Sequence, residues 1–532
     1  MIEQTSEEKV KSEKKPKQTI INTTLVILEG KVYEQIYDPA KAQCEYVSWN
    51  AKLNEYVYQE SVTDSLRKIK YVPICEESKW VKNGFIPLPS KPENYISFKH
   101  LVDEINKFTE KYLDIPEERR QLNTYAIILS YMTEKLHSIP YLRSVGMKGA
   151  GKSRFCDVYG NIAYKPINIL LPNIGNIYRL QDTYHGVLVI NEDISPIKGI
   201  NDNKELFTLL CSGTERGHPV PRCVGDKNDV FPFDPFGLKI LSSYKISNHG
   251  AYESRCLNTE MIGTTRKDIP VSLGVRFEKD SLKIRNMLLD FRLKTFNDDF
   301  ETYSNQTMGF WLGVSNRTAQ CLQPLSFLIA FDPEIKTFLL QVAEQKNVED
   351  ITRDSESFDG IVFLKYLEIV RTKQSIDVSI GEIKDSLLSK FPDIKPRGIA
   401  SSLKGLGLNT ERGYSGNKQV TNVLPNIERI EILVNTYLFP EERLDAITNY
   451  NNVVNGVKVE TETNVETQPQ QKLDVELSLH DKIQSLLTCI EMNDDGMTIE
   501  GLIGEGFDSA FLDNCLDQGV IIKNPNGKIV RG

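Results

Sequence analysis

"GMKGAGKS", residues 146 to 153, is the stretch that decides the fold of this 532-residue chain. It satisfies the pattern G-x-x-x-x-G-K-S in full, and such glycines let backbone amides turn inward around phosphates. The lysine reaches the β and γ phosphates, and the serine hydroxyl can ligate magnesium. An apolar strand, "PYLRSVG", precedes the loop and a helix, "SRFCDVYGNIA", follows it, which is the context that makes the motif specific. The pattern predicts an ATP site with Mg²⁺, held by Gly146, Gly149, Ala150, Gly151, Lys152, Ser153 and Arg154.

A second stretch, "GVLVINED" at residues 186 to 193, reads as a buried strand that ends in polar residues. Asn191 occupies the position where an aspartate usually helps to hold magnesium; it keeps a carbonyl acceptor but loses the charge. Glu192 can polarise the attacking water as a general base. Two alternatives stay open: a register one residue later, with Glu192 and Asp193 as the pair, or a plain strand end. The expected magnesium ligands are Ser153, Asn191 and Glu192.

Bulk composition indicates an ordinary globular chain. Its length allows about three to four domains of roughly 150 residues, and 40% hydrophobic with 26% charged residues is typical of globular proteins. The sequence has no run of 18 or more apolar residues, so it predicts no membrane span. The charged N-terminus does not resemble a signal peptide. Nine cysteines without a CxxC pair suggest neither a zinc ribbon nor a disulfide framework, so a reducing cytoplasm fits best. The expected location is the cytoplasm or nucleoid of a prokaryote. The net charge of −9 argues against a basic coat but allows local nucleic-acid surfaces.

From about residue 140 to 275 strands and helices alternate, as in α/β folds. We therefore predict an α/β phosphate-loop core with a helical lid, a small β-rich N-terminal domain and two C-terminal winged-helix domains. The expected parts are a disordered tail (1–18), the β-rich domain (19–92), the ATPase core with a helical collar (93–275), the lid (276–350), a winged helix (351–440), a linker (441–477) and a C-terminal winged helix (478–532).

Local signals place several elements. Ser97 is expected to cap a helix with apolar residues on one face, and Ser379 with Glu382 forms a capping box for a second helix of the first winged-helix domain. A third helix and the wing "ERGYSGNK" would supply phosphate contacts to DNA. A solvated charged face is the alternative for these cations. The DNA-contacting residues expected here are Arg397, Lys404, Arg412 and Lys418.

The segment "VPRCVGDKNDVFPFD", residues 220 to 234, predicts a hairpin between the carboxylate strand and the strand "GLKILSSY". Lys227 lies at its tip and Arg222 on its first strand, where cations can grip a nucleic-acid phosphate. A solvated lysine on a surface turn is the alternative.

Two further arginines follow. Arg255 in "AYESRCL" (251–257) is a candidate arginine finger for a neighbouring subunit, worth roughly 10³–10⁵ in rate, with a structural salt bridge as the alternative. Arg317 in "SNRTAQCLQPL" opens a helix of the expected lid and could sense the γ-phosphate, with a structural role as the alternative.

The order of phosphate loop, carboxylate strand, hairpin, polar strand end and S-R-C resembles AAA+ ATPases with a pre-sensor hairpin, over roughly residues 98 to 425. It is similar to the minichromosome maintenance helicases and their plasmid- or virus-borne relatives, and the last domain resembles the winged helix of the archaeal members. The resemblance implies a ring, with a hexamer as the expected form, and ATP between subunits. It implies these roles: Lys152, Ser153 and Glu192 in cis, Arg255 in trans, Ser242 or Ser243 as first sensor, and Lys227 on DNA in the central channel.

Two departures qualify the resemblance: Asn191 breaks the acidic pair, and the N-terminal region lacks the family's zinc-binding cysteines. We therefore expect a replication protein of a mobile element, an ATP-driven DNA helicase or translocase acting on single- and double-stranded DNA with a primase or other replication proteins. The alternative is an ATP-switched initiator or helicase loader in which Asn191 slows hydrolysis. A regulatory ATPase of the STAND type is less favoured because it has no evident use for the hairpin.

Overall fold

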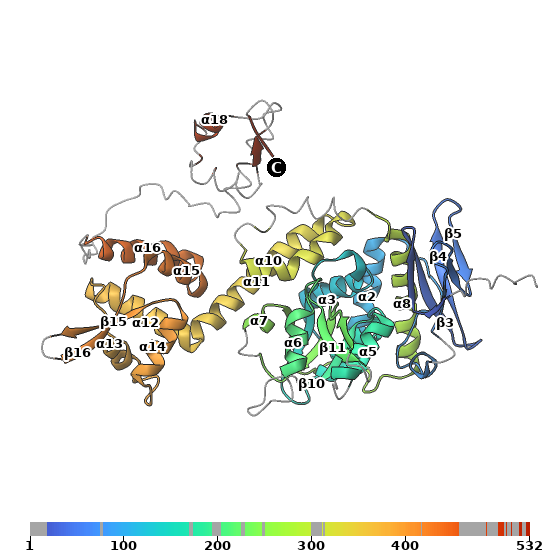
Figure 1. Ribbon diagram of the computed structural model, residues 1–532, viewed down its shortest axis with the longest axis horizontal. Coiled ribbons are helices and arrows are strands. Elements are labelled where there is room, and N and C mark those ends of the chain that lie inside the picture. The colour runs from blue at the N-terminus through green and yellow to red at the C-terminus, as the bar shows by residue number, and fades with distance from the viewer. Residues whose placement is uncertain are drawn as a thin grey trace, which may run out of the picture. The chain divides into compact units, whose positions relative to one another are not determined.

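The computed structural model describes residues 19–74, 78–169, 174–193, 204–224, 229–246, 250–298, 311, 314–415 and 418–456, with short pieces between 486 and 531 (Figure 1). It divides into two units, one comprising residues up to 310 with 316–339 and the other 311–315 with 340 onward. The expected tail 1–18, residues 457–477 of the expected linker and most of the last domain lie outside the described residues.

The centre of the first unit is a sheet of five parallel strands in the order β14-β8-β13-β10-β9. Every residue of β8 and β13 is buried, as expected of a parallel sheet covered on both faces. Helix α4 packs across β8, β13 and β10. The α/β prediction is confirmed at this level, and such a sheet is compatible with a phosphate-loop core. Its strands are β8 (Tyr141–Val145), β9 (Ile167–Ile169), β10 (Leu188–Asp193), β13 (Lys239–Ser243) and β14 (Cys256–Glu260).

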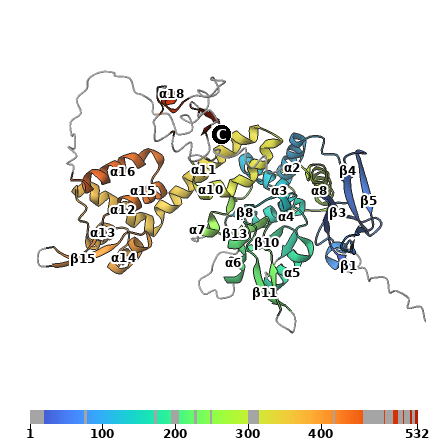
Figure 2. The same cartoon turned by 45° about the horizontal axis from the view of Figure 1, so that its top comes forward.

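The helices and the hairpin that connect these strands follow in chain order, and Figure 2 shows them around the sheet. The hairpin expected at residues 220 to 234 is present as the antiparallel pair β11 and β12. These elements are α4 (Lys152–Ile162), α5 (Ile174–Tyr184), α6 (Lys204–Ser212), β11 (Val220–Val224), β12 (Asp229–Phe233) and α7 (Gly250–Glu253).

The N-terminal strands form a four-stranded antiparallel sheet, β2-β3-β4-β5, and a three-stranded sheet, β1-β7-β6. Cys44 on β4 is disulfide-bonded, a pairing that the cysteine spacing did not predict. The strands are β1 (Thr19–Asn22), β2 (Leu25–Leu28), β3 (Lys31–Asp38), β4 (Gln43–Asn50), β5 (Glu55–Gln59), β6 (Val62–Asp64) and β7 (Ile69–Val72), followed by the short helix α1 (Lys79–Lys82).

Helix α8 (Val275–Thr295) joins the four-stranded sheet to the rest of the first unit (Figure 1). Leu289 and Leu293 pack against the buried face of β3 and β4, and α8 also contacts α2 and α4. This helix, which the sequence predicts as the start of a lid, is packed inside the first unit because apolar residues occur all around it. Thirteen of its 21 residues are buried.

A buried charged cluster ties the same junction together. Arg292 of α8 donates from Nε to Glu34 of β3 at 2.6 Å and from Nη1 to Glu134 at 2.8 Å. Lys165, before β9, lies 3.0 Å from the second Glu34 oxygen. Burial lowers the pKa of Lys165, and Glu34 opposes that shift. Because a buried charge without its partner is costly, this cluster fixes the β-rich region against the core.

The helical collar matches its sequence signals. Helix α2 (Phe98–Tyr112) begins at the predicted cap, Ser97, whose side chain accepts from the backbone N–H of His100. The cap satisfies an N–H group that the first turn leaves without a helical partner. The remaining helices of this unit are α3 (Glu117–Ser130), the 3₁₀ helix η1 (Thr133–Lys135), α10 (Asn316–Leu322), the 3₁₀ helix η2 (Gln323–Ala330) and the start of α11 (Glu334–Glu356).

In the second unit the C-terminal part of α11 and three further helices precede a hairpin, and two more helices follow it. The predicted capping box is present, since Ser379 accepts from the Glu382 backbone N–H and the Glu382 carboxylate accepts from Ser379. The elements are α12 (Phe358–Lys373), α13 (Ile380–Leu387), α14 (Pro396–Gly405), β15 (Thr410–Ser415), β16 (Lys418–Val423), α15 (Ile427–Tyr437) and α16 (Pro440–Val454); near the C-terminus come α18 (Ile499–Gly504), β17 (Ile521–Lys523) and β18 (Ile529–Arg531).

One expected boundary in the second unit is wrong. Residues 441 to 454, assigned to a linker, belong to α16, which packs against α12 through the buried side chains of Tyr366 and Tyr450. This segment is rich in Asn and Glu, so its composition does not reveal that α16 has one apolar face. Among the described residues, no helix is both long enough and apolar enough to cross a bilayer.

Candidate nucleotide-binding site

The loop between β8 and α4 has the backbone that its glycines predict. Gly149 and Gly151 have φ values of 85° and 99°, in the left-handed region that side chains disfavour. Gly146 has a different reason: a Cβ there would lie 2.3 Å from the carbonyl oxygen of Met261, which follows β14. The loop therefore needs glycine at all three positions.

The loop ends at the N-terminus of α4, an 11-residue helix with no acidic residue in its first turn. Free N–H groups and the helix dipole make such an end favourable for an anion. Lys152 is within the same loop and donates from Nζ to the Met147 carbonyl at 2.8 Å. Ser153 is exposed in the first turn. These features fit a nucleotide's phosphates, with the Ser153 hydroxyl available to a magnesium ion.

Serines at the end of β13 lie beside the loop. Gly146 donates its N–H to the Ser243 carbonyl at 3.2 Å, and Ser242 pairs in the sheet with Ser144 of β8. Both serine side chains are buried. The strand end expected to sense the nucleotide is therefore next to the phosphate loop, at the same edge of the sheet.

The end of β10 contains an irregularity at the residues in question. Ile190 pairs with Leu241 of β13, but the next pair joins Asp193 to Ser242, so Asn191 and Glu192 bulge from the ladder. Because β13 lies between β8 and β10, this bulge is about 10 Å across the sheet from β8. Asn191 is half-buried; the side chains of Glu192 and Asp193 lie outside the described residues. A bulge re-aims side chains, so strand alternation alone does not choose between the two registers.

Magnesium would meet a sparse donor set here. Within the described part of the chain, no three His, Cys, Asp or Glu side chains cluster closely enough to hold a metal ion. The chain offers the Ser153 hydroxyl and the Asn191 amide oxygen, so the nucleotide's phosphates would supply much of the coordination.

Arg154, expected at the nucleotide, donates to two backbone carbonyls in the structure. Its guanidinium donates to the carbonyl of Pro270 at 2.7 Å and to that of Val271 at 2.5 Å. These carbonyls belong to the segment between β14 and α8. Arg154 thus anchors that segment beside the phosphate loop.

Arg255 lies at the opposite end of the strands, where β8 and β14 begin. Its carbonyl accepts from the N–H of Tyr141, the first residue of β8, whereas the phosphate loop follows the last residue of that strand. The five residues of β8 separate the two ends of the strand by roughly 13 Å. Arg255 Nε donates to Thr214 Oγ1 at 3.1 Å, and the side chain lines a cavity of about 280 Å³.

Helix α10, which carries Arg317, lies at that same end of the strands. Gln320 and Cys321 of α10 line the cavity together with Arg255. The Arg317 side chain lies outside the described residues. Arg255 and the helix α10 are therefore on the side of the sheet away from the phosphate loop of their own chain.

A buried ion pair connects the strand of the phosphate loop to the segment of Arg255. Arg143 of β8 and Glu253 of α7 have fully buried side chains, and Arg143 Nη1 donates to Glu253 Oε1 at 2.7 Å. Arg143 Nε also donates to Asn258 at 2.9 Å, and its guanidinium lies over the Tyr252 ring. Glu253 is two residues from Arg255, so this pair fixes the orientation of α7.

Lys239 is another buried cation that the motif search missed. Its ammonium donates to the carbonyls of Pro235 at 2.7 Å, Gly237 at 3.0 Å and Gly213 at 3.4 Å. Burial lowers the pKa of Lys239 to about 7. Lys239 and Arg143 carry the same signal in the sequence: each is the one charged residue of a strand that is fully buried.

The residues expected on DNA are in different situations. Arg222 of β11 is paired with Glu205 at 3.0 Å and lies over the Tyr178 ring, so its charge is partly satisfied within the chain. Lys227 lies outside the described residues, as does the side chain of Lys418. The remaining three, Arg397, Lys404 and Arg412, are exposed on α14 and β15.

No protein-family model and no curated protein matches the chain. Among solved structures it is similar to the apo C-terminal region of NrS-1, at a TM-score of 0.34 and 10% identity, covering 77% of this chain and 96% of that one. It is also similar to an inhibitor-bound JCV helicase, with a TM-score of 0.21, 12% identity and coverage of 49% and 65%. For a Drosophila ORC bound to DNA the values are 0.17, 11%, 64% and 93%. Likenesses this distant assign the chain to no family.

Proposed function

We propose that this protein is an ATP-hydrolysing DNA helicase or translocase that forms rings, a hexamer in the simplest case, and acts in replication of a mobile element. The observation that carries the proposal is the complete phosphate loop between β8 and α4, with both left-handed glycines and a helix N-terminus free of acidic residues. The AAA+ and minichromosome-maintenance resemblance supplies the DNA part of the proposal.

Within the site, the Lys152 ammonium leaves the Met147 carbonyl and binds the β and γ phosphates. A magnesium ion held by Ser153 and Asn191 would neutralise charge on those phosphates. Glu192 takes a proton from the attacking water as general base. Ser242 or Ser243, on the neighbouring strand, donates a hydrogen bond to the γ-phosphate as first sensor. The amide of Asn191 supplies a neutral ligand, so we expect slower hydrolysis than with aspartate.

Arg255 and Arg317 would serve the ATP of the adjacent subunit. Support comes from the placement of Arg255 and α10 at the sheet edge opposite the phosphate loop. Within one chain, the length of β8, roughly 13 Å, separates Arg255 from the phosphate loop. In a head-to-tail ring the Arg255 end of one subunit faces the phosphate loop of the next. Each ATP site is then completed by the neighbouring subunit.

A complementation experiment tests this assignment. Lys152→Ala and Arg255→Ala proteins should each be inactive alone. Mixed in equal amounts and reassembled, about one quarter of interfaces combine an intact loop with an intact arginine. ATP turnover should return to about one quarter of the wild-type rate at any ring size. No recovery would place Arg255 in cis or in a purely structural role.

On DNA, the Lys227 hairpin would contact the strand in the ring channel, and the first winged-helix domain would contact duplex phosphates through α14 and β15. The test is ATP turnover with and without single-stranded DNA, together with displacement of a labelled strand from a fork. Lys152→Ala should abolish both activities, whereas Lys148→Ala, an exposed lysine of the same loop outside the motif roles, should abolish neither. Lys227→Ala should keep basal turnover and lose unwinding; normal unwinding would refute the channel role.

A second candidate function is favoured by Asn191 alone: an ATP-switched initiator or loader with slow hydrolysis. This function predicts tight ATP-dependent binding to duplex DNA without DNA-stimulated turnover and without strand displacement. The same two assays therefore separate the candidates.

A further inference from the structure

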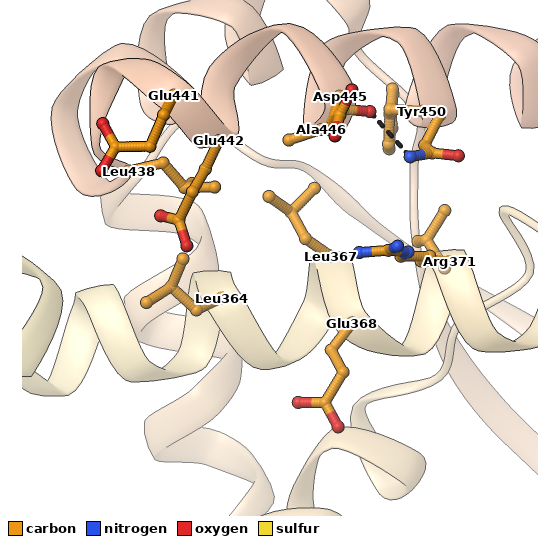
Figure 3. Close-up of a pocket in the computed structure, with 12 residues that line it drawn as sticks. Leu364, Leu367, Glu368, Arg371, Leu438, Glu441, Glu442, Asp445, Ala446 and Tyr450 are labelled. Atoms are coloured by element: carbon orange, nitrogen blue, oxygen red, sulfur yellow. Dashed lines mark hydrogen bonds between the residues drawn. The ribbon is translucent and has the colours of Figure 1, made fainter. Parts of the chain in front are cut away.

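A cavity of about 320 Å³ opens between α12 and α16 in the second unit (Figure 3). Its floor is apolar, with Leu364 and Leu367 on α12, Ala446 on α16 and Leu438 at the end of α15. The leucines are only half-buried, so apolar surface remains open to solvent in the groove. We call this feature the α12–α16 groove.

Carboxylates line one side of the groove. Glu441, Glu442 and Asp445 of α16 are exposed, and Glu442 points from α16 toward α12 in Figure 3. None of the three forms a salt bridge with a described residue. Arg371 is the only cation among the residues that line the groove. The groove thus combines an apolar floor with a net negative rim.

Another acidic residue of the lining behaves differently. Glu368 of α12 forms a salt bridge with Lys365 and points away from α16 in Figure 3. Its charge is satisfied within its own helix, because residues three positions apart are neighbours on a helix surface. The rim charge available to a ligand therefore comes from α16.

We propose that the α12–α16 groove binds a short basic segment of a partner protein, in which two or more aliphatic side chains are flanked by lysine or arginine. The aliphatic side chains would cover the leucine floor, where burial of apolar area supplies affinity. The cations would face Glu441, Glu442 and Asp445, which supplies orientation and discrimination. The proposal does not depend on ATP or on DNA unwinding.

The same charges disfavour nucleic acid as the occupant. Carboxylates around the opening repel phosphates, and binding to a nucleic-acid backbone requires cations instead. The cations expected on DNA, Arg397, Lys404 and Arg412, are exposed on α14 and β15 and do not line the groove. The second unit therefore offers two surfaces of opposite chemistry.

A purely structural role for two of the carboxylates makes a different prediction. Glu441 and Glu442 are in the first turn of α16, where negative charge also stabilises a helix. That role affects the stability of α16 but predicts no peptide binding. Asp445 lies one turn further, and its charge has less effect on the helix end, so it separates the two roles.

The experiment measures binding of fluorescein-labelled peptides to the full-length protein by fluorescence anisotropy. The probe is KLLKKLLKKLLK, with KSSKKSSKKSSK and ELLEELLEELLE as matched peptides that lack the apolar or the basic part. We expect the serine peptide to bind at least tenfold more weakly than the probe and the acidic peptide not to bind. Equal binding of the probe and the serine peptide would mean non-specific charge attraction and overturn the proposal.

Variants locate the site. Glu441→Lys with Asp445→Lys should weaken probe binding about tenfold or more, and so should Leu367→Gln. Asp445→Asn, which keeps side-chain size, should weaken it several-fold while the urea midpoint stays unchanged. Asp385→Lys with Asp393→Lys, exposed acids outside the groove, is the matched control and should change binding less than twofold.

Three results would overturn the proposal. The first is unchanged probe binding in the groove variants. The second is equally tight binding and competition by a peptide of residues 1–18, which would assign the groove to the chain's own lysine-rich end. The third is absence of probe binding together with a change in assembly size in the charge-reversed variant by sedimentation velocity, which would make the groove a contact between copies.

Discussion

The Arg143–Glu253 pair offers the sharpest test of how this core is held together. Both side chains are fully buried, and Arg143 makes two hydrogen bonds to the Glu253 carboxylate and a third to Asn258. Glu253→Gln keeps the volume but removes the negative charge, so the guanidinium remains buried without a counter-charge. Breaking a buried pair in this way costs about 3–5 kcal/mol, a large part of a typical domain stability of about 5–15 kcal/mol.

The double substitution separates charge from packing. Arg143→Met with Glu253→Met removes both charges and fills similar space with apolar atoms. Replacement of a buried pair by apolar residues is often neutral or stabilising, so the double variant should recover most of the loss. The coupling between the two positions would then be at least about 2 kcal/mol in magnitude.

Urea unfolding followed by tryptophan fluorescence measures these differences. Two of the three tryptophans, Trp49 and Trp80, belong to the same unit as the ion pair, so their signal reports its unfolding. The ion pair does not stabilise the core if Glu253→Gln costs less than about 1 kcal/mol, the range of a solvated surface pair. The same conclusion follows if the loss in the double variant equals the sum of the losses in Arg143→Met and Glu253→Met.

Three other outcomes are expected. Asn191→Asp should raise ATP turnover several-fold in a coupled assay; flat or lower turnover would favour the Glu192–Asp193 register. Gly146→Ala should cost about 1–3 kcal/mol by overpacking and lower ATP binding, because the added Cβ meets the Met261 carbonyl at 2.3 Å; Gly398→Ala, with open space around it, is the control. Burial lowers the pKa of Lys239 to about 7 from 10.5. Between pH 7 and pH 10.5 the unfolded state therefore binds one more proton than the folded state. Wild-type stability should therefore rise with pH from 7 toward 10, by at most roughly 1.4 kcal/mol per unit, and Lys239→Met should lack that slope in urea midpoints.

Predictions that depend on neighbouring residues alone agree with the structure. The Ser97 cap and the Ser379–Glu382 box are present because a side chain and a backbone N–H three residues apart meet whenever a helix starts. The phosphate loop likewise has its two left-handed glycines. The polar end of β10 is only partly anticipated, since the bulge that displaces Asn191 and Glu192 arises from pairing with β13.

Predictions that needed long-range packing fared less well. Helix α8, where the sequence predicts a lid, is buried because β3 and β4, more than 200 residues earlier, cover one of its faces. Residues 441 to 454 were assigned to a linker, but they fold as α16 because α12 supplies an apolar partner. A pattern in one segment does not reveal whether another segment will cover it.

By itself, then, the sequence determined the phosphate loop, its α/β setting and the helix starts, because these depend on backbone conformation within a few residues. Only the tertiary structure decided that Arg255 and α10 lie at the sheet edge opposite the phosphate loop. It also decided that Arg154 anchors a neighbouring segment and that Arg143 pairs with Glu253. Strand order brings these residues together across more than 100 positions of chain, and strand order follows from which apolar faces pack against each other.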